Sequence, residues 1–173
     1  AISAYNDFLA LNGSTPYDNL NNSISNYNAA QAAYQAGLTD YSSALTTYQN
    51  AQSQYDQAAQ DWNTALEQFQ LGSITQAELD SAFSTFQSAQ SDFNTAQSTF
   101  DSAQQTLNTL QTDWQNAKSQ LDTSITDYNS YITSKNALLA QANTAIDTWN
   151  HLADQASALI QRMNDLRTDS LGL

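Results

Sequence analysis

The chain has 173 residues with 17 acids and 4 bases, which gives a net charge of −13, and it contains no cysteine. A chain with this negative charge repels phosphate backbones and anionic lipids. Neither nucleic acid nor a membrane surface is therefore an expected partner. Disulfide and thiolate chemistry are excluded, and no apolar run approaches the roughly 20 residues that span a bilayer, so direct membrane insertion by this segment is not expected.

The chain begins with an N-terminal segment, 1–15, that ends in a helix-start signal. Thr15 suits an N-cap, Pro16 suits the first helical position, and Asp18 places a negative charge in the first turn. The first helix is therefore predicted over 16–70.

Apolar residues recur every seven positions through 16–70. One position of each heptad, called d, is large and mostly aromatic: Leu20, Tyr27, Tyr34, Tyr41, Tyr48, Tyr55, Trp62 and Phe69. Position g is small: Ala30, Gly37, Ala44, Ala51, Ala58 and Ala65. Position a is mixed: Tyr17, Ile24, Gln31, Leu38, Leu45, Gln52, Ala59 and Leu66. This 3.5-residue apolar spacing predicts a coiled coil, and its unbroken phase with few glycines and one proline argues against disorder.

A turn is predicted over 71–75. Gly72 suits the left-handed residue that closes a helix. Thr75 and Glu78 have the spacing of a capping box, with Ile74 and Leu79 as its hydrophobic staple. A second helix is therefore predicted over 76–168, with a break considered near 123–136, where β-branched residues, Asn and Ser are frequent.

The second helix repeats the pattern of the first. Its d positions are again large: Phe86, Phe93, Phe100, Leu107, Trp114, Leu121 and Tyr128. Because a short loop makes consecutive helices antiparallel, facing residue numbers should add to about 145, which pairs Trp62 with Phe83 and Gln52 with Phe93. We expect large rings to meet small or flexible partners. The fold class is therefore all-α, a long antiparallel coiled-coil hairpin, or a three-helix bundle if the C-terminal part folds back; the whole of 1–173 is expected to be a single extended helical domain.

Glutamines recur at a positions, which we expect to be buried and to set the helix register. They are Gln31, Gln52, Gln90, Gln97, Gln104 and Gln111.

The last part of the second helix carries an apolar stripe for which the first helix offers no partner, since its pairing ends near Tyr128. The candidate partner interface within 131–166 consists of Tyr131, Leu138, Leu139, Ile146, Trp149, Leu152, Leu159, Ile160, Met163 and Leu166. Ile132, Ala142 and Ala156 complete three adjacent apolar columns, g, a and d. A stripe of this size is unfavourable in water, so we expect it to bind another protein or a second copy of the chain.

The sequence offers no catalytic, cofactor-binding or metal-binding constellation. His151 is the only histidine. Asp147, His151 and Asp154 have the spacing of a helical metal site, but they fall at solvent-facing b and f positions, and one histidine makes poor zinc affinity. We therefore expect no enzyme.

Two family resemblances concern the hairpin. The stretch from Ser43 to Ala82, with Tyr55-Asp56, Ala65 and a returning Ala82-Phe83, resembles the coiled-coil ectodomain of type III secretion translocators. That resemblance implies an exported protein held at a secretion-needle tip. Residues 72–80 look similar to the hairpins of periplasmic membrane-fusion proteins, although the arginine of that family's tip motif is absent.

Three functions follow as hypotheses. The first is a non-enzymatic exported coiled-coil element that spaces, tethers or assembles, in a secretion apparatus, filament or adhesive surface protein. The second is a helical pore-forming toxin or translocator whose membrane-inserting part lies elsewhere. The third is an intracellular helical scaffold. The expected location is accordingly secreted or on the cell surface, with the cytoplasm as the alternative.

Overall fold

The structure, a computed structural model, describes residues 15–171, with side chains described through Arg167. Two helices make up this part of the chain: α2, Thr15–Gln70, and α3, Gln76–Leu171. Residues 71–75 connect them, and residues 15–171 contain no strand. The protein is therefore an all-α helical hairpin, as predicted; the first fourteen residues of the N-terminal segment lie outside the described residues.

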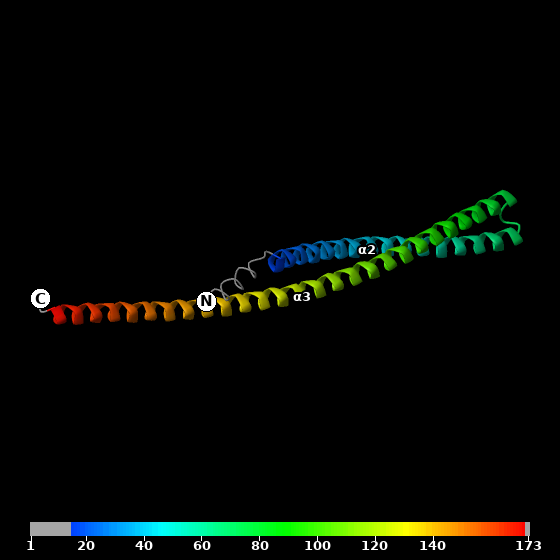
Figure 1. Ribbon diagram of the computed structural model, residues 1–173. Coiled ribbons are helices and arrows are strands. Elements are labelled where there is room, and N and C mark those ends of the chain that lie inside the picture. The colour runs from blue at the N-terminus through cyan, green and yellow to red at the C-terminus, as the bar shows by residue number, and fades with distance from the viewer. Residues whose placement is uncertain (1–14, 172–173) are drawn as a thin grey trace. The chain divides into compact units, whose positions relative to one another are not determined.

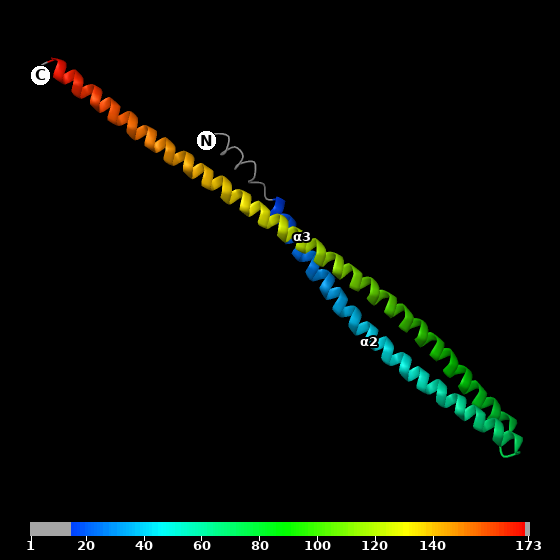
Figure 2. The same ribbon diagram turned by 90° about the horizontal axis from the view of Figure 1, so that it is seen from below.

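Internal contacts divide the chain into two units, of which the hairpin unit covers Ile24–Ser119. In both views, α2 and α3 run side by side in opposite directions within this unit and meet at the 71–75 turn (Figure 1, Figure 2). The second, called here the terminal unit, is described over residues 15–23 and 120–171.

The turn of the hairpin forms by satisfying the backbone groups at both helix ends. Gly72 has a φ of 71°, and its N–H donates to the carbonyl of Phe69 at 2.9 Å. The N–H of Ser73 donates to Gln68 at 2.8 Å, which completes a Schellman motif. These two bonds engage carbonyls that the last turn of α2 leaves unpaired.

The predicted capping box at the start of α3 is confirmed. The N–H of Thr75 donates to Oε2 of Glu78 at 2.7 Å, and the N–H of Glu78 donates to Oγ1 of Thr75 at 3.3 Å. The Thr75 hydroxyl also donates to the same carboxylate oxygen at 2.8 Å. Leu79, expected as part of the staple, is buried. Local sequence therefore closes the hairpin before any long-range contact is needed.

Aromatic rings form the contact between the helices. The Tyr55 ring lies between those of Phe86 and Phe93, each at 5.5 Å between centroids, and Tyr48 lies between Phe93 and Phe100 at 5.5 and 5.4 Å. Trp62 meets Phe83 at 4.9 Å, which agrees with the predicted register. The expectation that large rings would meet small partners is wrong here, because the antiparallel offset places Tyr48 and Tyr55 each between two d rings of α3.

Small residues lie where the helices come closest. The buried positions of α2 are all from column g: Gly37, Ala44, Ala51, Ala58 and Ala65. Ala96 and Ala117 are their buried counterparts on α3. At Gly37 an added Cβ would lie 2.6 Å from Cδ1 of Leu110, so the missing side chain on one helix makes room for a leucine on the other.

The prediction that the glutamines at position a are buried is wrong. All six glutamines, from Gln31 to Gln111, are exposed. The contact between the helices follows columns d and g rather than a and d, because alanine at g allows a close backbone approach on that side. Column a therefore lies at the flank, where Ile24 and Leu38 are 40% and 36% exposed.

The terminal unit has its own contacts between the start of α2 and the middle of α3. The rings of Tyr17 and Tyr128 are 6.3 Å apart, and the hydroxyls of Ser23 and Ser124 are hydrogen bonded at 2.7 Å. Residues 123–136 belong to one uninterrupted helix, so the break considered there is absent and the described residues form no third helix.

Candidate interaction surface

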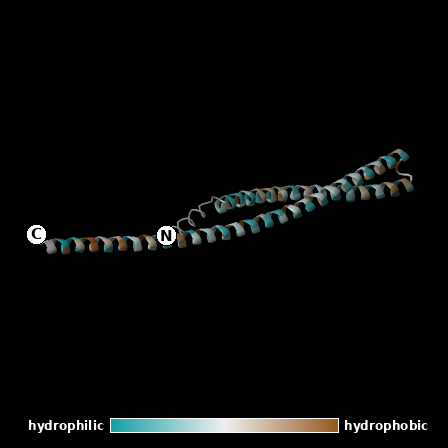
Figure 3. Ribbon diagram, viewed as in Figure 1, coloured by the Kyte–Doolittle hydropathy of each residue, from teal (hydrophilic) through white to brown (hydrophobic). Residues whose placement is uncertain are grey.

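The predicted interface on α3 is exposed along most of its length. Eight of its ten residues have large exposed fractions: Leu139 50%, Ile146 56%, Trp149 71%, Leu152 56%, Leu159 62%, Ile160 60%, Met163 64% and Leu166 62%. We call these eight the apolar stripe. Apolar segments recur along this part of α3 in the hydropathy view (Figure 3). The stripe is a surface that an apolar partner could cover.

The first two predicted interface residues differ from the rest. Tyr131 and Leu138 are half-buried. The Tyr131 ring lies 6.2 Å from that of Tyr128, and the ammonium of Lys135 lies 5.7 Å above it. These contacts are internal to the terminal unit, so Tyr131 belongs to the edge of the surface and the stripe begins at Leu139.

The charges beside the stripe balance one another. Residues 131–167 contain three aspartates (Asp147, Asp154 and Asp165) and three basic residues (Lys135, Arg162 and Arg167). The hairpin unit has nine acids and a single base, Lys118. The stripe therefore lies in the one part of the chain that a similarly acidic molecule can approach without strong net repulsion.

His151 takes part in a local contact only. It is exposed, and its Nε2 lies 3.0 Å from Nε2 of Gln155, one turn along the same helix. The part of the chain that the structure describes contains no group of three or more His, Cys, Asp or Glu placed to hold a metal ion. The contact that the structure shows for His151 is therefore one within its own helix.

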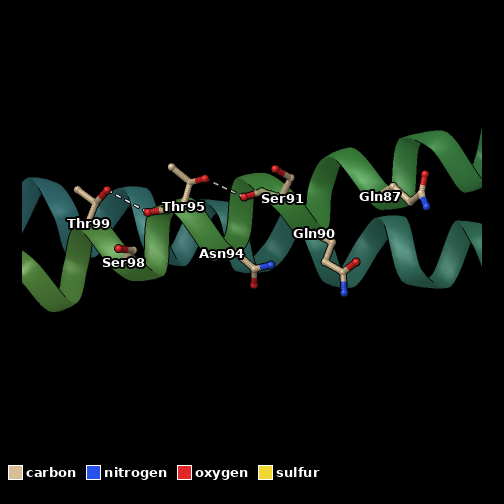
Figure 4. A pocket seen from close by; sticks show the side chains of 7 residues that line it. All are labelled: Gln87, Gln90, Ser91, Asn94, Thr95, Ser98 and Thr99. Atoms are coloured by element: carbon tan, nitrogen blue, oxygen red, sulfur yellow. Dashed lines mark hydrogen bonds between the residues drawn. The ribbon is translucent and has the colours of Figure 1, made fainter.

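Polar grooves run over the hairpin unit. The one in Figure 4 is lined from α3 alone by Gln87, Gln90, Ser91, Asn94, Thr95, Ser98 and Thr99. The Thr95 hydroxyl donates to the carbonyl of Ser91 and the Thr99 hydroxyl to that of Thr95, both at 2.9 Å (Figure 4). Because these hydroxyl protons are used within the helix and no titratable side chain lines the groove, it offers only weak hydrogen-bonding chemistry.

Two more grooves lie over the small g residues. One is flanked by Asp61 of α2 and Asp92 of α3 above Ala58 and Ala89. The other shares Asp92 and lies above Ala51 and Ala96. These two carboxylates are the charged groups that line the grooves.

The carboxyl group of Glu78 has a lowered pKa. Hydrogen bonds from the Thr75 backbone and hydroxyl lower the pKa of its carboxyl group below the ordinary value of 4.5. Because these bonds stabilise the charged form, the shift reflects helix capping. Glu78 is therefore a structural residue of the turn.

One buried polar atom of the hairpin core is unsatisfied. Nε1 of Trp114 is buried and has no hydrogen-bond partner among the described residues. Its ring lies 6.4 Å from that of Tyr27, tilted by 37°, and stacks on the Tyr34 ring at 5.4 Å with planes 6° apart. Ring packing therefore holds this side chain in place at the cost of an unmade hydrogen bond.

Sequence reasoning missed a small apolar surface at the turn. Leu71 is 80% exposed, and Phe69 and Phe83 nearby are 38% and 40% exposed. The available signal was a leucine beside Gly72, at a position where a polar residue would end the helix equally well.

Within residues 15–171, neither helix combines the length and the hydrophobicity that crossing a membrane requires.

No protein-family model, no curated protein and no solved structure matches the chain. The two family resemblances described above therefore stay predictions, and the proposed function rests on the residues themselves.

Proposed function

We propose that the chain is a non-enzymatic, exported coiled-coil element that spaces, tethers or assembles parts of a larger structure. The observation that carries this proposal is the apolar stripe at the end of an unbroken helix of 96 residues. Such a helix has a contour length of roughly 140 Å at 1.5 Å per residue, and its stripe supplies an attachment surface. Length and a contact surface are what a spacer requires.

The composition of the solvent-facing surface supports export. Its polarity comes mainly from Ser, Thr, Asn and Gln, with only two lysines in the chain. The absence of cysteine suits an oxidising environment in which the hairpin needs no disulfide. Among exported assemblies, the resemblance of residues 43–82 to translocator ectodomains favours a secretion apparatus over a filament or an adhesive stalk.

An intracellular scaffold is the second candidate. The same stripe favours it, because an exposed apolar helix face can bind an amphipathic helix of a partner in either location. Fractionation of cells that produce the protein from its own gene separates the two: recovery on the cell surface or in the medium supports the exported element, and recovery only in the cytosol supports the scaffold.

Small-angle X-ray scattering tests the spacer role. A spacer should have a maximum dimension well above 100 Å, since α3 alone has a contour length of roughly 140 Å. The measurement should be made at several protein concentrations and extrapolated to infinite dilution. A maximum dimension near 80 Å, which is the length expected of a folded-back bundle, would contradict the spacer function whatever the oligomeric state.

A further inference from the structure

We propose that the partner of the apolar stripe is the same stripe of a second copy, packed antiparallel about a twofold axis at Leu152. This inference rests on the proposed function in treating the stripe as an assembly surface. It goes further because it names the occupant and the register.

The intrachain contacts define how column g of α3 meets an antiparallel helix. The hydroxyls of Ser23 and Ser124, both at g, are hydrogen bonded, and Gly37 faces Leu110, again g against g. Column d interleaves, as the Tyr55 ring does between Phe86 and Phe93. Leu138, Ala145, Leu152, Leu159 and Leu166 continue column g at the same seven-residue spacing. The stripe therefore extends a face of α3 that already packs on an antiparallel helix.

The same packing rule makes the stripe complementary to itself. With Leu152 facing its own copy, Leu159 faces Ala145 and Leu166 faces Leu138. Column d interleaves, so Trp149 lies between Ala156 and Trp149 of the other copy, and Met163 lies between Ala142 and Lys135. A large side chain therefore meets an alanine at three places, as close packing of two helices needs, and the two Trp149 rings meet at the axis. A stripe evolved for an unrelated helix has no reason to match its own reversed sequence in this way.

Large and small side chains occupy different heptad columns in the stripe and in the hairpin unit. In the hairpin unit the large residues are at d and the small ones at g, whereas in the stripe leucines are at g and alanines alternate with Trp149 and Met163 at d. A second stripe has the same redistribution, so each copy offers alanines at d opposite Trp149 and Met163 of the other copy.

Charge also favours a second copy. The segment 131–167 carries equal numbers of aspartates and basic residues, so two such segments can associate without net repulsion.

The available area is sufficient for a specific dimer. Burying a leucine-sized side chain removes roughly 100 Å² of apolar surface from water. Five of the eight stripe residues lie in columns g and d: Trp149, Leu152, Leu159, Met163 and Leu166. Covering them on both copies would remove on the order of 1,000 Å² of apolar surface, the lower end of the range for a specific interface. Partial cover of the column a residues at the flank adds to this area.

The first test measures oligomeric state with charge variants at the axis. We expect the chain to be a dimer by sedimentation equilibrium at micromolar concentration. Leu152→Glu places two carboxylates across the axis and should raise the dimer dissociation constant at least about a hundredfold, and Leu152→Lys should do the same. An equimolar mixture of the two variants should form a heterodimer, because opposite charges then face each other. Thr148→Glu, on an exposed face of the same helix, is the matched control and should leave the dimer intact.

The second test determines the orientation by disulfide cross-linking. Because the chain has no cysteine, each introduced cysteine is the only one present. Ala145→Cys and Leu159→Cys variants, mixed under oxidising conditions, should cross-link to each other and far less to themselves. Self-linking of each variant would indicate a parallel pair and overturn the antiparallel arrangement.

A chain that stays monomeric at high concentration, or whose association is unchanged in Leu152→Glu, overturns this inference. An intact monomer would mean that the stripe is covered by another segment or by a different protein. The spacer function is tested separately, by the maximum dimension from small-angle X-ray scattering. A failure of the dimer inference can therefore be distinguished from a failure of the spacer function.

Discussion

The same helix, α3, presents its heptad columns in two contrasting ways. Within the hairpin unit its d rings are half-buried between tyrosines of α2, as Phe93 is between Tyr48 and Tyr55. From Ile146 to Leu166 every residue is exposed, including Trp149 at 71%. The pattern of apolar residues is equally regular in both stretches. A heptad repeat therefore indicates an apolar face along a helix. Whether that face is a buried core or an exposed stripe depends on whether another helix of the chain lies against it.

The largest change in the free energy of unfolding is expected when a ring is removed from the hairpin core. Tyr55→Ala loses two ring contacts at 5.5 Å and should lower the free energy of unfolding by about 3 kcal/mol. Trp149→Ala removes a larger ring that has no intrachain ring contact among the described residues. Under conditions where the chain is monomeric, it should change stability by less than about 0.5 kcal/mol. Urea denaturation followed by circular dichroism makes the comparison, and equal losses would remove the distinction between core and stripe.

The second test enlarges a small residue of the hairpin contact. Ala58 is 6% exposed at the closest approach of the helices, so Ala58→Leu should cost about 1–3 kcal/mol by forcing them apart. Ala32→Leu, at an exposed position of α2, provides the control for helix propensity and hydrophobicity and should be nearly neutral. A destabilisation no greater at Ala58 than at Ala32 would show that column g does not lie in the contact.

The turn gives a smaller effect. Gly72 has a φ of 71°, where an L-residue is strained, and nothing lies within 4 Å of an added Cβ. Gly72→Ala should therefore cost about 1 kcal/mol from backbone strain alone. Gly72→Asn should recover part of that loss, since asparagine tolerates the left-handed region better. Thermal melts of the three proteins at one pH provide the measurement; an Ala variant as stable as the wild type would contradict the strain.

The smallest effect is the pH dependence of the capping box. Because the folded-state pKa of Glu78 is lowered, its contribution is fully present above the unfolded value of 4.5 and is lost as pH falls through the folded value. The melting temperature of wild type should exceed that of Glu78→Gln at pH 7, and the difference should shrink toward pH 3. A difference that grows on acidification would mean that the charged carboxylate does not contribute. Asp80→Asn, which removes an exposed carboxylate near the start of the same helix, serves as the control.

Several features were predictable because they depend on neighbouring residues. Thr75 and Glu78 form a capping box from side chains three positions apart, and Gly72 takes the conformation that only glycine adopts without strain. The register that pairs Trp62 with Phe83 also followed from the length of the turn, since a short loop leaves little freedom in how two helices align.

The exposure of the stripe was predictable for a related reason, whereas its role as a partner interface stays a prediction. The stripe was identified by subtraction, as the apolar columns left over once α2 is paired, and eight of the ten predicted residues are exposed. Tyr131 and Leu138 were included because the periodicity marks no boundary between a paired and an unpaired stretch of one helix. Leu71 escaped notice because a single apolar residue in a turn has no period at all.

Taken alone, the sequence determined two long helices, the turn that reverses the chain and the columns along which apolar residues lie, because each depends on local backbone preference and spacing. Only the tertiary structure decided which pair of columns forms the contact, with d and g inside and the glutamines of a outside. It also decided that rings meet rings and that α3 passes through 123–136 without a break. The physical reason is that these outcomes depend on how closely two backbones approach, and that distance is set jointly by residues far apart in the chain, such as Gly37 and Leu110.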